Sequence, residues 1–323
     1  MNSKKKVIII CICSFVILIS ILLCFKMNIQ TNINNTVENK EHQQNEQKEQ
    51  VNTQQNPSFN TLDIDKIEET PKNLKIYDIE EGYLTVPYNS KALKHNYNWD
   101  NLSTSDNGYY FYSDNLYETK FGIDVSEYQG NINWEKVKKA GVDFAIIRLG
   151  YRGYGSSGKL MLDHKFIKNV EQATKNEIAI GIYFFSQAIN EEEAIAEATY
   201  VLDNIRNKNI TYPICFDLEK IKFDTARTDN LTIDEITKIS LAFCQQIKNA
   251  GYTPMIYGNA KTFTTRMHLE QFNNYQKWYA DYQDKPLYPY DFAFWQYSEK
   301  GSINGINTKV DLNLHFVPKN LEV

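Results

Sequence analysis

From residue 121 onward, short apolar runs alternate with longer stretches whose apolar residues recur at helical spacing. Such an order is typical of parallel strands that are joined by amphipathic helices. The predicted strands cover 121–126, 143–150, 178–187, 212–219, 253–259, 277–282, 292–298 and 309–316. The clearest predicted helices cover 134–140, 163–175, 191–208 and 233–251. Capping residues support this assignment, because Asn190 with Glu193 and Thr232 with Glu235 have the spacing of helix N-termini.

The helices thin out late in the chain, where strands follow one another through short polar connections. We count eight strands but only about five good helices, and no dinucleotide-binding fingerprint that would favour an open doubly wound sheet. The pattern therefore predicts an α/β fold for 120–323: a TIM-like (β/α) barrel with a degenerate last third, closed as a ring of parallel strands.

The N-terminal residues have a different character. An uncharged apolar run, Val7–Phe25, follows Lys4, Lys5 and Lys6. It is long enough to cross a bilayer, and the lysines favour an N-terminus inside the cell. We expect residues 1–26 to be an uncleaved transmembrane signal-anchor. A cleaved signal peptide is the alternative, but the apolar core is longer than usual and no A-x-A site comes after it.

The chain between this anchor and the predicted barrel divides into two parts. Residues 27–60 are rich in Asn, Gln and Glu and predict a disordered linker. Residues 61–119 contain aromatic alternations that predict a small β-rich lead-in, packed on the barrel. Within it, the acidic pair Asp78 and Glu80 is expected to be a solvated turn.

Composition excludes several classes of function. The net charge is −5, which does not suggest a nucleic-acid partner. The histidines lack metal-ligand spacing and no phosphate-binding loop is present, so we expect neither metal nor cofactor. Cys215 and Cys244 lie within apolar patterns, and we favour buried free thiols over a disulfide between them.

Acidic residues fall where predicted strands end or in the last strand. Asp124, the pair Asp217 and Glu219, and Asp311 come from three strands, with Asp281 as a further candidate. The working groups of a β/α barrel lie at the carboxyl ends of its strands, so these acids are expected in one mouth. A carboxylic acid beside a carboxylate is what glycoside hydrolysis requires. Taken alone, Asp217 and Glu219 would more often be a surface pair or a salt-bridged pair.

Aromatic residues on or just after the strands offer flat apolar faces on which sugar rings can pack, with a neighbouring amide for the hydroxyl groups. Each of these aromatic residues also fits the barrel core. The candidate substrate-binding residues are Tyr183, Tyr257, Trp278, Tyr282, Trp295 and Gln296.

Over about residues 120–316 the chain resembles the glycoside hydrolase family 25 lysozymes, the Chalaropsis-type N-acetylmuramidases. The resemblance rests on these segments, in order: "GIDVSEYQGNINWEKVKKAGVDFAIIRLGYRGYG", "IGIYFFSQA", "FDLE", "IYGN", "WYADY", "FWQYS" and "VDLN". It implies a (β/α)5(β)3 barrel that cleaves the β-1,4 bond after N-acetylmuramic acid, with Glu219 as proton donor. The family's other acids map onto Asp217, Asp124 and Asp311. The lead-in resembles that of some clostridial members.

Two positions depart from the family pattern: Leu218 stands where an aromatic residue is common, and Phe184 where histidine is frequent. Neither departure touches the four acids. We therefore expect a membrane-tethered, extracellular muramidase that acts on peptidoglycan glycan strands, or a secreted one if the N-terminal segment is cleaved. The alternatives are a catalytically inactive cell-wall-binding scaffold on the same barrel and a chitinase-like glycosidase.

Overall fold

The computed structural model describes residues 71–222 and 224–319. Within these ranges, no helix has the length and apolar character needed to cross a bilayer. The predicted signal-anchor, the linker and the first residues of the predicted lead-in lie outside the described part of the chain.

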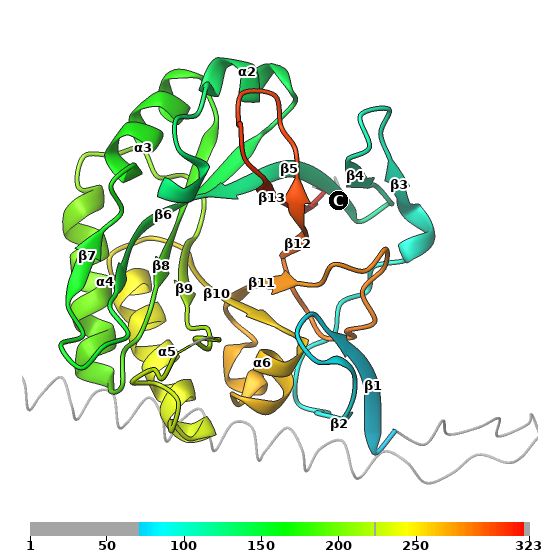
Figure 1. Cartoon of the computed structure of the whole chain (residues 1–323). Coiled ribbons are helices and arrows are strands. Elements are labelled where there is room, and N and C mark those ends of the chain that lie inside the picture. Colours follow the sequence, from blue (N-terminus) through cyan, green and yellow to red (C-terminus); the bar gives the residue numbers. More distant parts are fainter. Residues whose placement is uncertain (1–70, 223, 320–323) are drawn as a thin grey trace, which may run out of the picture. The chain divides into compact units, whose positions relative to one another are not determined.

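Eight strands close into a barrel (Figure 1), because β5 pairs with both β6 and β13. In barrel order they are β5 (Tyr117–Val125), β6 (Phe144–Arg152), β8 (Ala179–Phe185), β9 (Ile214–Asp217), β10 (Pro254–Asn259), β11 (Gln276–Ala280), β12 (Phe294–Gly301) and β13 (Val310–Pro318). A short strand, β7 (Leu160–Leu162), adds to the end of β6. The predicted closed α/β barrel is thus confirmed.

Helices follow the first five barrel strands: α2 (Trp134–Lys139), α3 (Phe166–Lys175), α4 (Glu191–Ile205), α5 (Ile233–Asn249) and α6 (Ala260–Thr265). Shorter 3-10 turns are η1 (Trp99–Asn101), η2 (Glu127–Gln129) and η3 (Leu269–Phe272). The predicted caps are confirmed, since Asn190 accepts a hydrogen bond from the Glu193 amide and Thr232 with Glu235 forms a capping box.

The expectation that all strands of the ring run parallel is wrong for the last strand, β13. The barrel strands β5, β6, β8, β9, β10, β11 and β12 run parallel to one another, whereas β13 runs antiparallel to both β12 and β5. The short segment 302–309 joins β12 to β13. Such a connection suffices for an antiparallel neighbour, while a parallel one needs a crossover of a dozen or more residues.

A cluster of apolar side chains, called here the apolar plug, fills the barrel interior near the amino ends of the parallel strands. Its buried residues come from five strands and are Phe144, Ile146, Cys215, Met255, Trp278 and Phe294. A Cβ atom on Gly122 would lie 2.2 Å from Cζ of Phe144, so the absence of a side chain at this position of β5 lets the ring fit. Both Cys215 and Cys244 are free and buried, as predicted.

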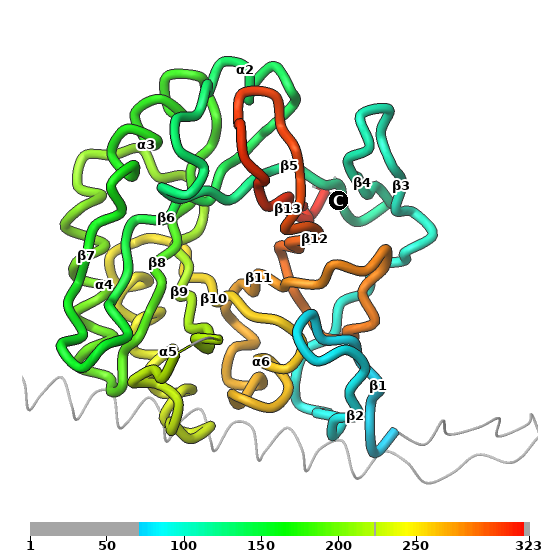
Figure 2. Tube along the Cα trace, viewed as in Figure 1, coloured from blue at the N-terminus to red at the C-terminus, as the bar shows by residue number. Residues whose placement is uncertain are grey.

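The lead-in consists of two hairpins, β1 (Asn73–Asp78) with β2 (Gly82–Pro87) and β3 (Leu102–Thr104) with β4 (Tyr110–Tyr112). It lies along β11–β13, whereas α3, α4 and α5 lie on the other side of the barrel (Figure 2). The predicted packing of the lead-in on the barrel is confirmed. Its predicted boundary at residue 119 falls inside β5, which begins at Tyr117.

Tyr97 illustrates how this packing is made. Its ring stacks on Phe316 with the centroids 4.1 Å apart, and its hydroxyl group donates a hydrogen bond of 2.6 Å to the carbonyl oxygen of Phe292. Trp99 lies edge-on against Trp295 at 5.7 Å. The aromatic residues of the lead-in thus cover the part of the barrel where β12 and β13 have no helices of their own.

Replacing Tyr97 with alanine should therefore destabilise the whole barrel. We expect the free energy of unfolding to fall by about 3–5 kcal/mol, the usual loss when a buried aromatic side chain is truncated. Chemical denaturation followed by tryptophan fluorescence measures it. The control is Tyr83→Ala, because Tyr83 also belongs to the lead-in but is 59% exposed. For this variant we expect the free energy of unfolding to change by no more than about 0.5 kcal/mol. Equal losses in the two variants would contradict this account.

Candidate active site

The alternation of side chains along the strands places a layer of carboxyl groups next to the apolar plug, toward the carboxyl ends of the parallel strands. Residues two apart on a strand face the same side, so Cys215 lies in the plug and Asp217 lies above it at the end of β9. Asp124, Asp217, Glu219 and Asp311 all line one cleft of about 450 Å³. The sequence prediction that these four acids meet in one mouth therefore agrees with the structure.

Asp311 reaches this mouth because β13 is antiparallel. It stands near the start of β13, directly opposite Asp124 in the strand register. In a parallel strand the same rim would be reached only at the carboxyl end. The reversed direction of β13 thus brings its first residues to the rim where the other strands end.

Gln296 is the central hydrogen-bonding residue of the site. Its Nε2 donates to Asp124 Oδ2 at 3.0 Å. Its Oε1 accepts from the hydroxyl groups of Tyr257 at 2.9 Å and Tyr282 at 3.0 Å. Asn313 Nδ2 donates a second bond to Asp124 Oδ2, at 2.8 Å. Asp124 is therefore held by two amides, both of which bind its Oδ2.

Asn313 was missed in the sequence analysis, although a signal existed. It lies two residues after Asp311 on β13 and therefore on the same face. Besides binding Asp124, it accepts a hydrogen bond of 2.8 Å from Nε1 of Trp278. It thereby fixes a cleft-lining tryptophan relative to an acid of the site.

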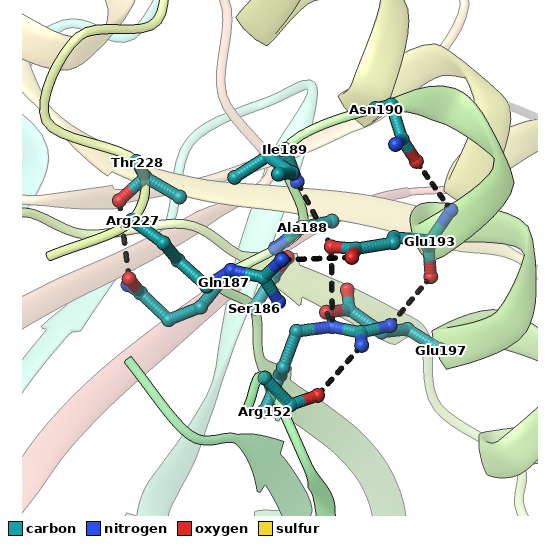
Figure 3. Close-up of polar contacts among 11 residues, drawn as sticks. Arg152, Ser186, Gln187, Ala188, Ile189, Asn190, Glu193, Glu197, Arg227 and Thr228 are labelled. Atoms are coloured by element: carbon teal, nitrogen blue, oxygen red, sulfur yellow. Dashed lines mark hydrogen bonds and ion pairs between the residues drawn. The ribbon is translucent and has the colours of Figure 1, made fainter. Parts of the chain in front are cut away.

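Glu219 lies two residues beyond the end of β9, in a loop that a polar network anchors. Gln187 Nε2 donates to the carbonyl oxygen of Glu219 at 3.3 Å. Thr228 Oγ1 donates to Gln187 Oε1 at 3.1 Å (Figure 3). Arg227, from the same loop, pairs with Glu193 of α4 at 2.8 Å. The loop is thus tied to the barrel at Glu219 itself and again near its far end.

Under this loop, Arg152 of β6 and Glu197 of α4 form a buried ion pair with Nε and Oε1 2.6 Å apart. Arg152 also donates to the carbonyl oxygens of Gly158 and Glu193. The carboxylate of Glu197 compensates the buried positive charge of Arg152. Arg152 therefore fixes α4 on β6, and with it Glu193, the residue to which Arg227 of the loop is bound.

Burial makes the acids of the cleft retain protons. It raises the pKa of Glu219 to about 7, against a hydrogen bond with Asp217 that lowers it. Burial, followed by the charge of Glu219, raises the pKa of Asp217 well above its ordinary range. Burial and the charge of Asp124 raise the pKa of Asp311 to about 9. Two adjacent pairs of carboxyl groups, Asp217 with Glu219 and Asp124 with Asp311, thus hold protons into the neutral range.

Of the predicted substrate-binding residues, Tyr183, Tyr257, Trp278, Tyr282 and Gln296 line the cleft. Trp295 does not, since it is fully buried between the barrel and the lead-in and donates from Nε1 to the carbonyl oxygen of Asp281. Alternation along β12 turns Gln296 inward and Trp295 outward. Asp281, the further acidic candidate, is fully buried away from the cleft lining and accepts a hydrogen bond from Tyr279.

The lead-in supplies two cleft residues that the sequence analysis did not expect, Ile79 and Glu80. They form the turn between β1 and β2. The expectation of a solvated turn is wrong for Asp78, which is 0% exposed and accepts hydrogen bonds from three backbone amides. No local signal separated this turn from an ordinary hairpin end, because its burial depends on contact with α6.

The raised pKa values determine how stability should depend on pH. Between the unfolded pKa values near 4 and the raised folded values, the folded state binds more protons than the unfolded one, so the free energy of unfolding falls as pH rises. We expect lower stability at about pH 8 than at about pH 5 in urea denaturation. Each pKa unit of difference corresponds to about 1.4 kcal/mol.

Asp311→Asn should weaken this pH dependence, because it removes one carboxyl group whose pKa is raised. The matched control is Glu118→Gln, which changes a half-exposed carboxylate on β5 and should leave the pH dependence as in the wild type. Stability that rises between these two pH values would show that the acids are not held in protonated form.

Comparison with known proteins places this geometry in a family. The sequence model described as "Glycosyl hydrolases family 25" matches residues 123–306. Lysozyme M1 of Streptomyces globisporus is 29% identical over 203 residues, which cover 59% of this chain and 66% of that protein. The autolytic lysozyme of Clostridium acetobutylicum is 25% identical over 197 residues, covering 59% of this chain and 54% of that protein.

Among solved structures, the modular autolysin LytC from Streptococcus pneumoniae, in complex with a synthetic peptidoglycan ligand, superimposes with a TM-score of 0.56. The identity is 22%, and the likeness covers 77% of this chain and 57% of that one. It bears on the fold alone. The chain spans between 54% and 66% of the length of these three proteins.

Proposed function

The chain belongs to glycosyl hydrolases family 25, so its barrel is a lysozyme-type glycoside hydrolase, and we propose that it hydrolyses peptidoglycan. The bond cleaved is the β-1,4 bond between N-acetylmuramic acid and N-acetylglucosamine. The observation that carries this proposal is the convergence of Asp124, Asp217, Glu219 and Asp311 in one cleft with raised pKa values. Glycoside hydrolysis needs such a proton-holding acid next to a carboxylate.

Glu219 is the proton donor to the leaving oxygen. It is partly exposed, whereas Asp217 is 3% exposed, so Glu219 is the member of the pair that a substrate can reach. A pKa of about 7 keeps it protonated in mildly acidic solution and about half protonated at neutral pH. A general acid works best when its pKa lies near the working pH.

Asp217 orients the substrate. Its Oδ1 is buried and has no hydrogen-bond partner among the described residues. A buried acceptor without a partner costs free energy, which a donor from the substrate would offset. The N–H of the substrate's N-acetyl group is such a donor, and holding it would direct the carbonyl oxygen toward the reacting carbon. A water molecule positioned for attack is the other donor of the required kind.

Asp124 and Asp311 adjust the charge of the site and hold the sugar or the water. Two amides fix Asp124, and Asp311 faces it across the β5–β13 pair. The sugar rings pack against Tyr183, Tyr257, Trp278 and Tyr282, all of which line the cleft. For the barrel itself we propose the (β/α)5(β)3 organisation, supported by helices that follow the first five strands.

Glu219→Gln should remove most of the lytic activity and leave the fold intact. Loss of a general acid lowers the rate by about 10²–10⁴-fold, and the amide retains the shape of the side chain. Release of soluble muropeptides from purified cell walls measures the activity, and circular dichroism checks the fold. The products that the wild-type enzyme releases should carry N-acetylmuramic acid at the reducing end.

The matched control is Glu118→Gln, whose carboxylate lies on β5 beside Lys120. It should keep wild-type activity. Clearing of cell walls by the Glu219 variant at the wild-type rate would remove Glu219 from the mechanism. A wild-type protein that binds cell walls without cleaving them would contradict the proposed activity.

The enzyme acts from the outer face of the cell membrane, to which residues 1–26 anchor it. The apolar run from Val7 to Phe25 and the three lysines before it support this proposal. The full chain should sediment with membranes and be digested by protease added to intact protoplasts. A variant that lacks residues 1–26 should remain in the supernatant. Release of a shortened protein into the medium, with a new N-terminus just after the apolar run, would show a cleaved signal peptide instead.

A further inference from the structure

The turn of the β1–β2 hairpin forms one wall of the cleft. Ile79 and Glu80 line it together with Glu219, although the hairpin precedes the residues that match the family model. In Figure 1 the hairpin lies beside α6. This part of the cleft is therefore built by the lead-in and not by the barrel.

The position of this turn is fixed by Asp78. Its Oδ1 accepts from the amides of Glu80 at 3.0 Å and Glu81 at 3.1 Å, and its Oδ2 accepts from the amide of Lys261 in α6 at 2.9 Å. Lys261 Nζ also pairs with Glu81. A fully buried carboxylate thus joins the hairpin turn to the first turn of α6, so Glu80 is held at one place.

Glu80 meets a cation there that comes from the loop of the proton donor. Lys222 Nζ lies 3.1 Å from Glu80 Oε1, and Lys222 follows Glu219 by three residues. The side chains of Glu80 and Lys222 are 27% and 58% exposed. Both residues line the same cleft as Glu219. The cleft of the proton donor thus holds an anion and a cation that are paired with each other.

We propose that Glu80 is a positioning residue for acid catalysis: the hairpin turn places its negative charge beside Glu219 and favours the protonated form of that acid, while Lys222 opposes it. This inference rests on the proposed role of Glu219 as proton donor. It assigns to the lead-in a part in the reaction, namely setting the pH range over which the barrel works.

Electrostatics at Glu219 supports the proposal. Burial is the first cause of its raised pKa, and the hydrogen bond with Asp217 lowers it; among the charges, Glu80 raises the pKa further and Lys222 lowers it. Coulomb interactions at the edge of a partly buried cleft act with an effective dielectric constant of about 20, so a single charge shifts a nearby pKa measurably.

Other titratable groups face Glu219 from several elements. The acids are Asp217 on β9, Asp124 on β5, Asp311 on β13 and Glu299 on β12. Tyr257 and Tyr282 approach with phenol groups, and Lys220, Lys261 and Arg266 line a smaller pocket next to Glu219. All of them belong to the barrel and its loops. Glu80 is the acid that the lead-in adds to this set within the described residues.

The test compares two single variants of the full chain, which should move the activity profile in opposite directions. Glu80→Gln should shift the basic limb of the profile to lower pH by about 0.5 unit, which is about a threefold loss of protonated acid above the pKa. Lys222→Gln should shift the same limb to higher pH. The control Glu118→Gln alters an acid of β5 that lies outside the cleft lining, and it should leave the profile unchanged.

A loose or misfolded hairpin would lower activity at every pH in both the Glu80 and the Lys222 variant, and would not produce shifts of opposite sign. Identical pH profiles in wild type, Glu80→Gln and Lys222→Gln would overturn the inference. If Glu219→Gln is inactive in the same assay, such a result leaves the proposed function in place.

A second measurement does not depend on the substrate. The side-chain carboxyl carbon of Glu219, labelled with carbon-13 and assigned through Glu219→Gln, reports its titration directly. Its midpoint should fall in Glu80→Gln and rise in Lys222→Gln. Midpoints that stay at the wild-type value would reject the role of Glu80 even if peptidoglycan proved not to be the substrate.

Discussion

The site depends on one constraint, the alternation of side chains along strands that close into a ring. Every second residue of a closed barrel must point inward, and the ring is too narrow for water to fill it. The lower inward positions hold the apolar plug around Phe144, Cys215 and Trp278, and the next ones hold Asp124 and Asp217. Carboxyl groups placed directly on an apolar layer lose hydration, and this loss is the first cause of their raised pKa values.

Burying several acids together is unfavourable, and the surroundings of the site offset that cost in two ways. Gln296 and Asn313 bind Asp124 by hydrogen bonds, so that its charged form is also accommodated. Aromatic packing supplies the remaining stability. Where the barrel lacks helices, Tyr97 and Trp99 of the lead-in cover Phe316 and Trp295. The lead-in thus performs for the last third of the barrel the covering role that helices perform elsewhere.

The eight barrel strands and the acids Asp124, Asp217 and Glu219 could be predicted from the sequence, because both depend on local patterns. Apolar runs mark buried strands, and acids at the ends of parallel strands mark the mouth. The position of Asp311 at the same rim depends instead on the antiparallel direction of β13. The choice between Trp295 and Gln296 could not be made, since both faces of a barrel strand are buried and the pattern does not show which one is the interior. The direction of β13 and the burial of Asp78 were missed for a related reason. Each is fixed by a partner distant in sequence: β5 for the strand, and Lys261 for the carboxylate.

The same buried carboxylate explains why a lead-in outside the family-matched region can influence chemistry in the barrel. A charge on a mobile turn would be averaged over many positions and screened by solvent. Asp78 removes that freedom by binding two amides of its own turn and one amide of α6. The charge of Glu80 is then delivered from a fixed place, and no reorganisation is needed when the proton moves. A segment that covers the barrel for stability is thereby also rigid enough to act on Glu219, the proposed proton donor.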